Sequence, residues 1–181
     1  MTDALFIKQT SGIWDKVAGE NAAAIHPGLD LHKRLPGLFH AGDFFYSIFN
    51  PKKFAFDFLS PQVETVLGYA PSAVTVPMYM EKIHPEDRTW VYEFEQLAMC
   101  FLSGLAIEKL MKYKIRYDFR IKNKNGDYVR LQHQGMVVEH DDKGSINRIL
   151  SIQSDISHLK KDGLPVMAYI GLDGEPSYLN A

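Results

Sequence analysis

Hydrophobic and charged residues alternate strictly along residues 111–122, which read Met-Lys-Tyr-Lys-Ile-Arg-Tyr-Asp-Phe-Arg-Ile-Lys. Successive side chains of a β-strand point to opposite faces, so this alternation predicts a half-buried strand. A helix would scatter the charges around its circumference. The face expected to pack into the core carries Met111, Tyr113, Ile115, Tyr117, Phe119 and Ile121. The face expected to be exposed to solvent carries Lys112, Lys114, Arg116, Asp118, Arg120 and Lys122.

Two turns after this strand predict an antiparallel meander of three strands. Asn125-Gly126 is a strong hairpin signal, and a second strand should run from Tyr128 to about His140. The turn at residues 141–144 then leads into a third strand over residues 145–156. One face of this sheet should be packed and the other exposed to solvent.

The residues before this meander predict two further strands. Residues 43–50 are rich in aromatic side chains, which favour a buried strand. Residues 54–59 read Phe-Ala-Phe-Asp-Phe-Leu and predict a second strand. Its alternation should place Phe54, Phe56 and Phe58 on one face.

Helices are expected between these strands and the meander. Ser60-Pro61 starts a short helix, with serine as the cap and proline in the first turn. His84-Pro85-Glu86-Asp87 opens the longest helix, because proline suits the first helical position and acidic side chains stabilise the positive helix N-terminus. Apolar residues recur at helical spacing from Trp90 to Leu105, so this helix should pack across the sheet.

The order of these elements, together with several short motifs, resembles a PAS domain. The motifs are Leu67-Gly68-Tyr69, His84-Pro85-Glu86-Asp87, the Asn-Gly-Asp turn between two strands, and the closing Asp155-Ile156-Ser157. The resemblance covers residues 43–158. It implies an α+β fold, with a five-stranded antiparallel sheet, helices on one side and an N-terminal helical extension.

The resemblance divides the chain into three parts. We expect an N-terminal helical extension over residues 1–42, a PAS domain over 43–158, and a C-terminal extension over 159–181. The extension should contain a strand from Val166 to Ile170 and lead toward an effector domain outside this sequence. This arrangement resembles bacterial PAS-containing regulators that end in a LuxR-type helix-turn-helix.

Charge and composition exclude several classes of partner. The formal net charge is −2, from 20 basic and 22 acidic residues, so the chain has no strong basic surface for nucleic acid or anionic membrane. A single cysteine, Cys100, allows neither an internal disulfide nor a cysteine-rich zinc site. No apolar run is long enough to span a bilayer and no secretory signal is present, so we expect a cytoplasmic protein.

Candidate ligand-binding residues come from the last strand of the meander and from the aromatic residues facing it. Gln153 and Ser151 share the less apolar face of that strand. In flavin-binding relatives of PAS domains a glutamine near this place contacts the cofactor, so the resemblance implies a ligand role for Gln153. The alternatives are a glutamine on the outer face of the sheet, a core amide, and aromatic residues that merely fill the core. The predicted ligand-binding set is Gln153, Ser151, Tyr117, Phe119 and Tyr113.

The sequence identifies no cofactor, metal site or catalytic group. Residues 68–90 lack the Asn-Cys-Arg-Phe-Leu-Gln-like segment of the light-sensing flavin subfamily. The histidines have no metal-ligand spacing, and His84 is expected to fix the start of the long helix. Phosphate-binding glycine loops and nucleophile motifs are also missing from the sequence, which argues against an enzyme.

We therefore expect a sensory, signal-input domain that binds a small molecule or a partner and relays the signal to an effector domain. The alternative is a ligand-free interaction module that acts by dimerisation. Residues 1–24 carry several apolar side chains, Trp14 among them, which predicts a homodimer with this segment at the interface. A helix that caps its own sheet is the other interpretation of that apolar stripe.

Overall fold

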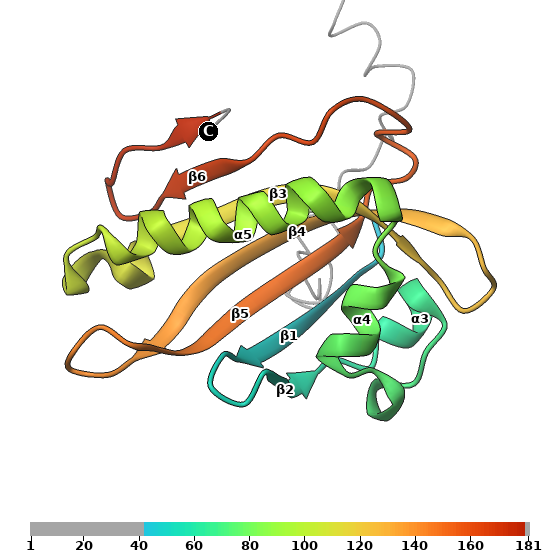
Figure 1. Cartoon of the computed structure of the whole chain (residues 1–181), viewed down its shortest axis with the longest axis horizontal. Coiled ribbons are helices and arrows are strands. Elements are labelled where there is room, and N and C mark those ends of the chain that lie inside the picture. The colour runs from blue at the N-terminus through green and yellow to red at the C-terminus, as the bar shows by residue number, and fades with distance from the viewer. Residues whose placement is uncertain (1–41, 180–181) are drawn as a thin grey trace, which may run out of the picture. The chain divides into compact units, whose positions relative to one another are not determined.

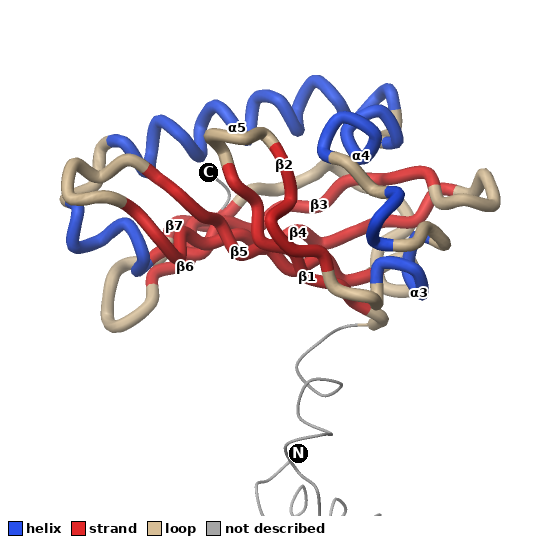
Figure 2. The backbone as a smooth tube through the Cα atoms, turned by 90° about the horizontal axis from the view of Figure 1, so that it is seen from below, coloured by secondary structure: helices blue, strands red, loops and turns tan. Residues whose placement is uncertain are grey.

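Residues 42–179, which the computed structural model describes, form an antiparallel sheet with helices packed on one face (Figures 1 and 2). The strands lie in the order β2-β1-β5-β4-β3-β6-β7. They are β1 (Phe44–Asn50), β2 (Ala55–Leu59), β3 (Tyr113–Lys122), β4 (Tyr128–His140), β5 (Ile146–Asp155), β6 (Ala168–Gly171) and β7 (Tyr178–Leu179). The α-helices are α3 (Val63–Leu67), α4 (Val76–Lys82) and α5 (Arg88–Ser103), and the 3₁₀-helices are η1 (Pro71–Ala73), η2 (Pro85–Asp87) and η3 (Ile107–Lys112). The predicted α+β fold is confirmed.

Residues 113–122 of the alternating stretch form β3, and the apolar face of β3 is buried as predicted. The prediction is wrong at Met111, which is 46% exposed, because residues 111 and 112 end the 3₁₀-helix η3 instead of starting the strand. β3 pairs with β4 from Lys114 opposite Met136 to Lys122 opposite Tyr128. Gly126 closes this hairpin with a φ of 96°, a backbone conformation that side chains disfavour. The predicted Asn-Gly turn is therefore confirmed.

The long helix α5 crosses the inner face of the sheet, as predicted, and buries Val91, Ala98 and Leu102 against it (Figure 1). Its entry is fixed by His84, whose Nδ1 accepts a hydrogen bond from the backbone N–H of Glu86 at 3.3 Å. His84 thus caps the turn before α5, which is the structural role expected for it.

The prediction that Phe54, Phe56 and Phe58 share one face is wrong, because the β1–β2 ladder contains a bulge. Phe58 and Phe56 pair with two successive residues of β1, so Asp57 between them has no partner in the ladder. An extra residue of this kind reverses the faces beyond it. Phe56 accordingly faces the helices, whereas Phe58 stacks on the exposed ring of Tyr46 with 5.5 Å between ring centroids.

The sheet has seven strands rather than the five expected, because the C-terminal residues extend it. β6 pairs with the start of β3, and β7 pairs with β6. Met167 is fully buried, and Tyr169 stacks on Phe101 of α5 with 4.0 Å between ring centroids. These apolar contacts explain why the segment returns to the sheet edge, and the strand predicted at 166–170 is observed as β6.

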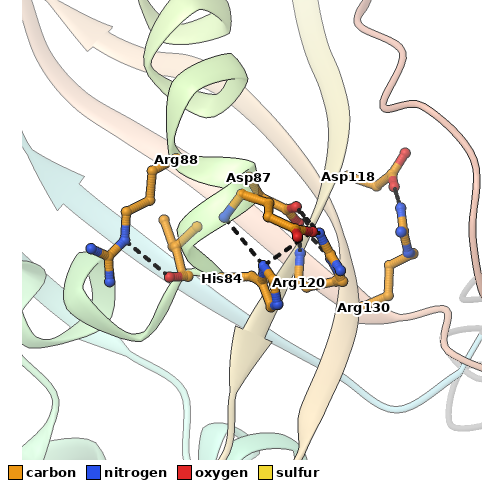
Figure 3. Close-up of polar contacts among 8 residues, drawn as sticks. His84, Asp87, Arg88, Asp118, Arg120 and Arg130 are labelled. Atoms are coloured by element: carbon orange, nitrogen blue, oxygen red, sulfur yellow. Dashed lines mark hydrogen bonds and ion pairs between the residues drawn. The ribbon is translucent and has the colours of Figure 1, made fainter.

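The expectation that the charged face of β3 is exposed is wrong at Asp118, which is 8% exposed. Its carboxylate accepts hydrogen bonds from Arg130 Nη1 at 2.5 Å and from Lys160 Nζ at 2.8 Å. Arg120 is also engaged, because its backbone N–H and its guanidinium both donate to Asp87 before α5 (Figure 3). Segments distant in sequence therefore cover part of this face.

The helix and dimer interface predicted for residues 1–24, like most of the extension predicted over 1–42, lie outside the described residues.

Replacing Phe119 by alanine should lower the free energy of unfolding by about 3–5 kcal/mol, because its ring fills the core beneath the helices. Phe119 is 2% exposed and lies 6.3 Å from the Tyr79 ring. Urea denaturation measures the change. Lys122→Ala, at the exposed end of the same strand, should change it by no more than about 0.5 kcal/mol. Equal losses in the two variants would contradict the assignment of faces.

Candidate functional site

A cavity of about 320 Å³ lies between the inner face of the sheet and helices α4 and α5. Five strands contribute to its walls: Ser47 and Phe49 from β1, Phe56 from β2, Tyr117 and Phe119 from β3, His133 from β4, and Ile149, Ser151 and Gln153 from β5. α4 contributes Val76, Tyr79 and Met80, while α5 contributes Val91 and Glu95. The sequence thus assembles the cavity from side chains more than a hundred positions apart.

Aromatic rings make most of the apolar wall and hold Tyr79 in place. The Tyr79 ring contacts Phe45, Phe56 and Phe119 edge-on, with centroid distances of 6.5, 6.1 and 6.3 Å. Edge-to-face packing of this kind restricts how a ring can turn. Three neighbouring rings therefore position the Tyr79 hydroxyl, which also lies close enough to the Gln153 side chain for that amide to lower the tyrosine pKa, against the larger opposite effect of burial.

Three buried polar atoms at this cavity have no hydrogen-bond partner. They are Ser47 Oγ, the Tyr79 hydroxyl oxygen and Gln153 Oε1. Ser47 lies opposite Ser151 in the β1–β5 ladder, two positions along the strand from Gln153. Buried polar groups in native proteins nearly always find a partner, so three unpaired atoms at one cavity indicate a place where polar groups of a ligand or water bind.

Glu95, Tyr117, His133 and the Nε2 atom of Gln153 form a second polar group at the cavity, and these are paired with each other. Nε2 of Gln153 lies 3.1 Å from Nδ1 of His133, so the amide donates and the imidazole accepts. The Tyr117 hydroxyl donates to Glu95 Oε1, and the His133 ring lies 4.8 Å from the Tyr117 ring. Two hydrogen bonds and one ring contact therefore order this edge of the cavity.

Burial keeps His133, Tyr79 and Tyr117 uncharged. It lowers the pKa of His133, with Glu95 opposing the change, so the imidazole is neutral near pH 7. Burial also raises the pKa of Tyr79 and of Tyr117 well above the usual range of tyrosine. The Tyr79 hydroxyl is therefore available as a donor at any physiological pH.

The family model for the PAS fold matches residues 56–153, which is 98 of the 181 residues. The chain belongs to the PAS family. Its similarity to solved PAS structures is one of fold. The sensory box histidine kinase/response regulator from Burkholderia thailandensis E264 superposes with a TM-score of 0.52 at 20% identity, over 73% of this chain and 88% of that one.

A second similar structure is the N-terminal domain of a diguanylate cyclase with PAS/PAC sensor from Marinobacter aquaeolei. It has a TM-score of 0.48 and 24% identity, over 64% of this chain and 96% of that one. No curated protein matches the chain significantly. The described residues thus have the PAS fold.

Four of the five residues predicted to bind a ligand line the large cavity of the PAS domain: Gln153, Ser151, Tyr117 and Phe119. Tyr113 lies outside it, beside a smaller cavity near the end of α5, where its ring packs edge-on against Phe101. Of the alternatives for Gln153, the outer face of the sheet is wrong, since the side chain points inward and is 5% exposed.

Sequence reasoning missed three polar residues at the cavity: Ser47, Tyr79 and His133. The only signal available for Ser47 was its position between aromatic residues in a buried strand. Tyr79 lies in a helix of seven residues, too short for a periodic pattern to assign its face. His133 lies between two glutamines of β4, and the spacing of the histidines gives no sign that this one is functional.

Gly135 leaves space for the His133 imidazole in this PAS domain. A Cβ atom at position 135 would lie 2.9 Å from His133 Nε2 and 3.4 Å from Ser151 Oγ. The first distance is too short for a van der Waals contact. A side chain at this position would therefore displace His133 and disturb its contact with Gln153.

Among residues 42–179, no helix is both long and apolar enough to cross a membrane.

Acidification should destabilise the PAS domain through His133. Its pKa in the folded state lies below the ordinary value of 6.5, so the unfolded chain takes up the proton first as pH falls. The stability that this group contributes is complete above pH 6.5 and is lost as pH falls below it, by up to about 1.4 kcal/mol per pH unit. Urea denaturation at several pH values from 7.5 to 5.5 measures the loss.

His133→Gln should remove that part of the pH dependence. His140→Gln, at the end of the same strand, leaves the buried imidazole in place and should keep the wild-type profile. Identical profiles for wild type and His133→Gln would show that His133 titrates alike in the folded and unfolded chains.

Proposed function

We propose that this PAS domain is the signal-input module of a regulator and that it binds an uncharged, planar aromatic molecule in the cavity beneath α4 and α5. The observation that carries the proposal is the set of three unpaired buried polar atoms in an aromatic cavity. An apolar pocket with a few convergent polar groups is the usual form of a small-molecule site.

The charges around the cavity favour a neutral ligand. Glu95 accepts from the Tyr117 hydroxyl, and burial holds His133 in its uncharged form. The other side chains lining the cavity are apolar or neutral and polar. An anion would lose its hydration without gaining an opposite charge, and a cation would have to compete with the Tyr117 hydroxyl for Glu95. Either ligand would lose several kcal/mol of binding free energy, and each 1.4 kcal/mol is about a tenfold loss of affinity.

The unpaired atoms specify a ligand that both donates and accepts hydrogen bonds. Gln153 Oε1 can only accept, so the ligand must place an N–H or O–H group beside it. The neutral Tyr79 hydroxyl can donate, and Ser47 Oγ can do either. A flat ring fits the edges of the surrounding phenyl groups. The volume of about 320 Å³ lies at the small end of the pockets that hold drug-sized ligands.

The elements that carry the ligand-contacting residues also contact the C-terminal part of the domain through other residues. β3, which carries Tyr117 and Phe119, has β6 paired along its edge. α5, which carries Glu95, holds Tyr169 through Phe101. A ligand that shifts β3 or α5 would therefore change how the C-terminal strands are held. An effector beyond the C-terminal extension, such as a LuxR-type helix-turn-helix, would receive that change; this part of the proposal rests on the sequence resemblance alone.

A ligand-free dimerisation module is the second candidate, and one observation favours it. Tyr46 and Phe58 are 39% and 42% exposed, and their rings stack on the outer face of β1 and β2. Exposed aromatic pairs are typical of protein interfaces. In this alternative the cavity would hold only water.

2-Quinolinone is a suitable probe, because it is flat and neutral and places an N–H donor next to a carbonyl acceptor. Naphthalene has a similar shape and no polar group. We expect 2-quinolinone to bind about tenfold more tightly, since each buried polar atom left unpaired costs about 1–3 kcal/mol. Ligand-observed NMR titration of the whole chain measures both affinities.

Gln153→Leu should remove most of the preference for 2-quinolinone while leaving the domain folded. Ile152→Val, on the neighbouring position of β5, should retain it, because that side chain does not line the cavity. Equal affinity for the two probes in the wild-type protein would contradict the proposed role of the polar atoms. A cavity that binds neither probe would favour the dimerisation module.

The homodimer proposed from the sequence is tested by light scattering, which measures the mass of the particle in solution. Phe58→Asp should convert a dimer to a monomer if the exposed aromatic pair forms the contact, because a charge would be buried there. Trp14→Asp should do so if residues 1–24 form it, and Lys143→Asp, in the turn between β4 and β5, serves as the surface control. A monomeric wild-type chain would reject the dimer.

A further inference from the structure

A second crevice, of about 160 Å³, lies outside the cavity just described, between the start of α5, strands β3 and β4, and the segment that follows β5. Its walls are Asp87, Trp90, Asp118, Arg120, Arg130 and residues 161–163 with Pro165. β6 pairs with β3 from Tyr113 to Arg116. Further along β3, the backbone of residues 83–84 forms a β-bridge and a hydrogen bond with residues 120–121. The crevice therefore sits beside the stretch of β3 between these two covered parts.

Arg130 is buried in this crevice with one edge of its guanidinium unpaired. The side chain is 9% exposed, and Nη1 donates to Asp118 Oδ2 at 2.5 Å. That is the only hydrogen bond of its guanidinium within residues 42–179, and the buried Nε has no partner. Nε and Nη2 form the side edge of the planar guanidinium, which suits two parallel hydrogen bonds to a carboxylate or phosphate.

Trp90, two residues into α5, supplies a second unpaired donor at the same crevice. Its buried Nε1 has no hydrogen-bond partner. Both an indole N–H and a guanidinium N–H can only donate. Whatever occupies the crevice must therefore accept hydrogen bonds from both, which differs from the mixed donors and acceptors of the larger cavity.

The neighbouring carboxylates are already engaged and do not fill this need. Asp118 accepts from Arg130 and from Lys160 Nζ at 2.8 Å. Asp87 accepts from the backbone N–H of Arg120 at 2.7 Å and from its guanidinium (Figure 3). The Arg120 guanidinium lowers the pKa of Asp87 against the opposing effect of burial, so this carboxylate stays ionised and bound to Arg120.

We propose that this crevice binds a small oxyanion, a carboxylate or phosphate group, between the Nε edge of Arg130 and the indole N–H of Trp90. A volume of about 160 Å³ exceeds the roughly 30 Å³ share of one water molecule, so a group of this size can enter. Lys161 on the outer wall adds a positive charge, while Asp162 beside it opposes the anion. The Asp118 and Asp87 ion pairs neutralise the remaining charges, which predicts moderate affinity governed by Lys161 and Asp162.

Binding would join two parts of the domain that are far apart in sequence. Arg130 lies on β4 and Trp90 at the start of α5, whereas residues 161–165 lead from β5 toward β6. An oxyanion held between them would fix this segment against the sheet. An oxyanion bound there would thus be a second signal, which acts on the C-terminal strands without entering the larger cavity.

The test follows the Trp90 indole N–H by NMR in a Trp14→Phe background, where it is the sole indole signal, since the chain has two tryptophans. Inorganic phosphate and sodium acetate are titrated separately into the whole chain, with sodium chloride at matched ionic strength. A saturable shift of the Trp90 signal with phosphate or acetate, and none with chloride, supports the site. The anion that saturates at lower concentration identifies the group as phosphate or carboxylate.

Three variants link the shift to these residues. Asp162→Asn should tighten binding and Lys161→Gln should weaken it, each by about two- to fivefold, because both change one exposed charge beside the anion. Trp90→Phe keeps the aromatic ring but removes the donor, and should weaken binding about two- to tenfold by calorimetry. Lys143→Gln, distant in the β4–β5 turn, should change nothing.

Two results would overturn the proposal. One is a Trp90 signal that does not saturate with either anion or that shifts equally with chloride, which would mean that the crevice holds water only. The other is an affinity that Asp162→Asn, Lys161→Gln and Trp90→Phe all leave unchanged, which would place the anion elsewhere on the chain.

Discussion

The contact between Asp87 and Arg120 holds the described domain together, because it fixes the start of α5 to the edge of β3. Asp87 is 2% exposed, and its carboxylate accepts from both the backbone N–H and the guanidinium of Arg120. Removing one partner of a buried pair leaves an uncompensated charge and typically costs about 3–5 kcal/mol. Without this contact α5 would lose its entry angle, and the cavity and the crevice would both lose a wall.

The pair of residues Phe119 and Arg120 shows how one strand serves two sites. Side chains alternate along β3, so Phe119 lines the aromatic cavity while its neighbours Asp118 and Arg120 line the polar crevice. The backbone between them is shared. A displacement of β3 by a ligand on one side would therefore alter the geometry on the other, which would couple the two proposed sites.

Much of the fold follows from local sequence patterns, and the departures have physical causes. The alternation in residues 111–122 and the turn at Gly126 were sufficient to predict β3 and its hairpin, because strand period and turn chemistry are local properties. Alternation could not show that Asp118 is buried, since its partner Lys160 is 42 positions away. Nor could it reveal the bulge at Asp57, which depends on the register with β1. β7 is a two-residue strand, too short to leave a pattern.

Four residues that line the candidate site were predicted, Ser151, Tyr117 and Phe119 from the faces of their strands and Gln153 with the help of the family resemblance. Gln153 was identified because a glutamine at that place has a role in related domains. Ser47 and Tyr79 had no such guide, and their unpaired atoms become evident only when three-dimensional packing removes water from them. The same holds for Trp90. Its position in the helical pattern assigns it to the apolar face of α5, but its side chain lines the crevice.

The five buried side-chain atoms without partners among the described residues divide between two places, and this division argues against chance. Three lie at the aromatic cavity and include an acceptor and hydroxyl groups; two lie at the crevice and are donors only. Unpaired atoms left by imperfect packing should be scattered through the core, since the cost of about 1–3 kcal/mol each applies wherever they occur. Their confinement to the walls of two hollows is what the two proposed binding sites require.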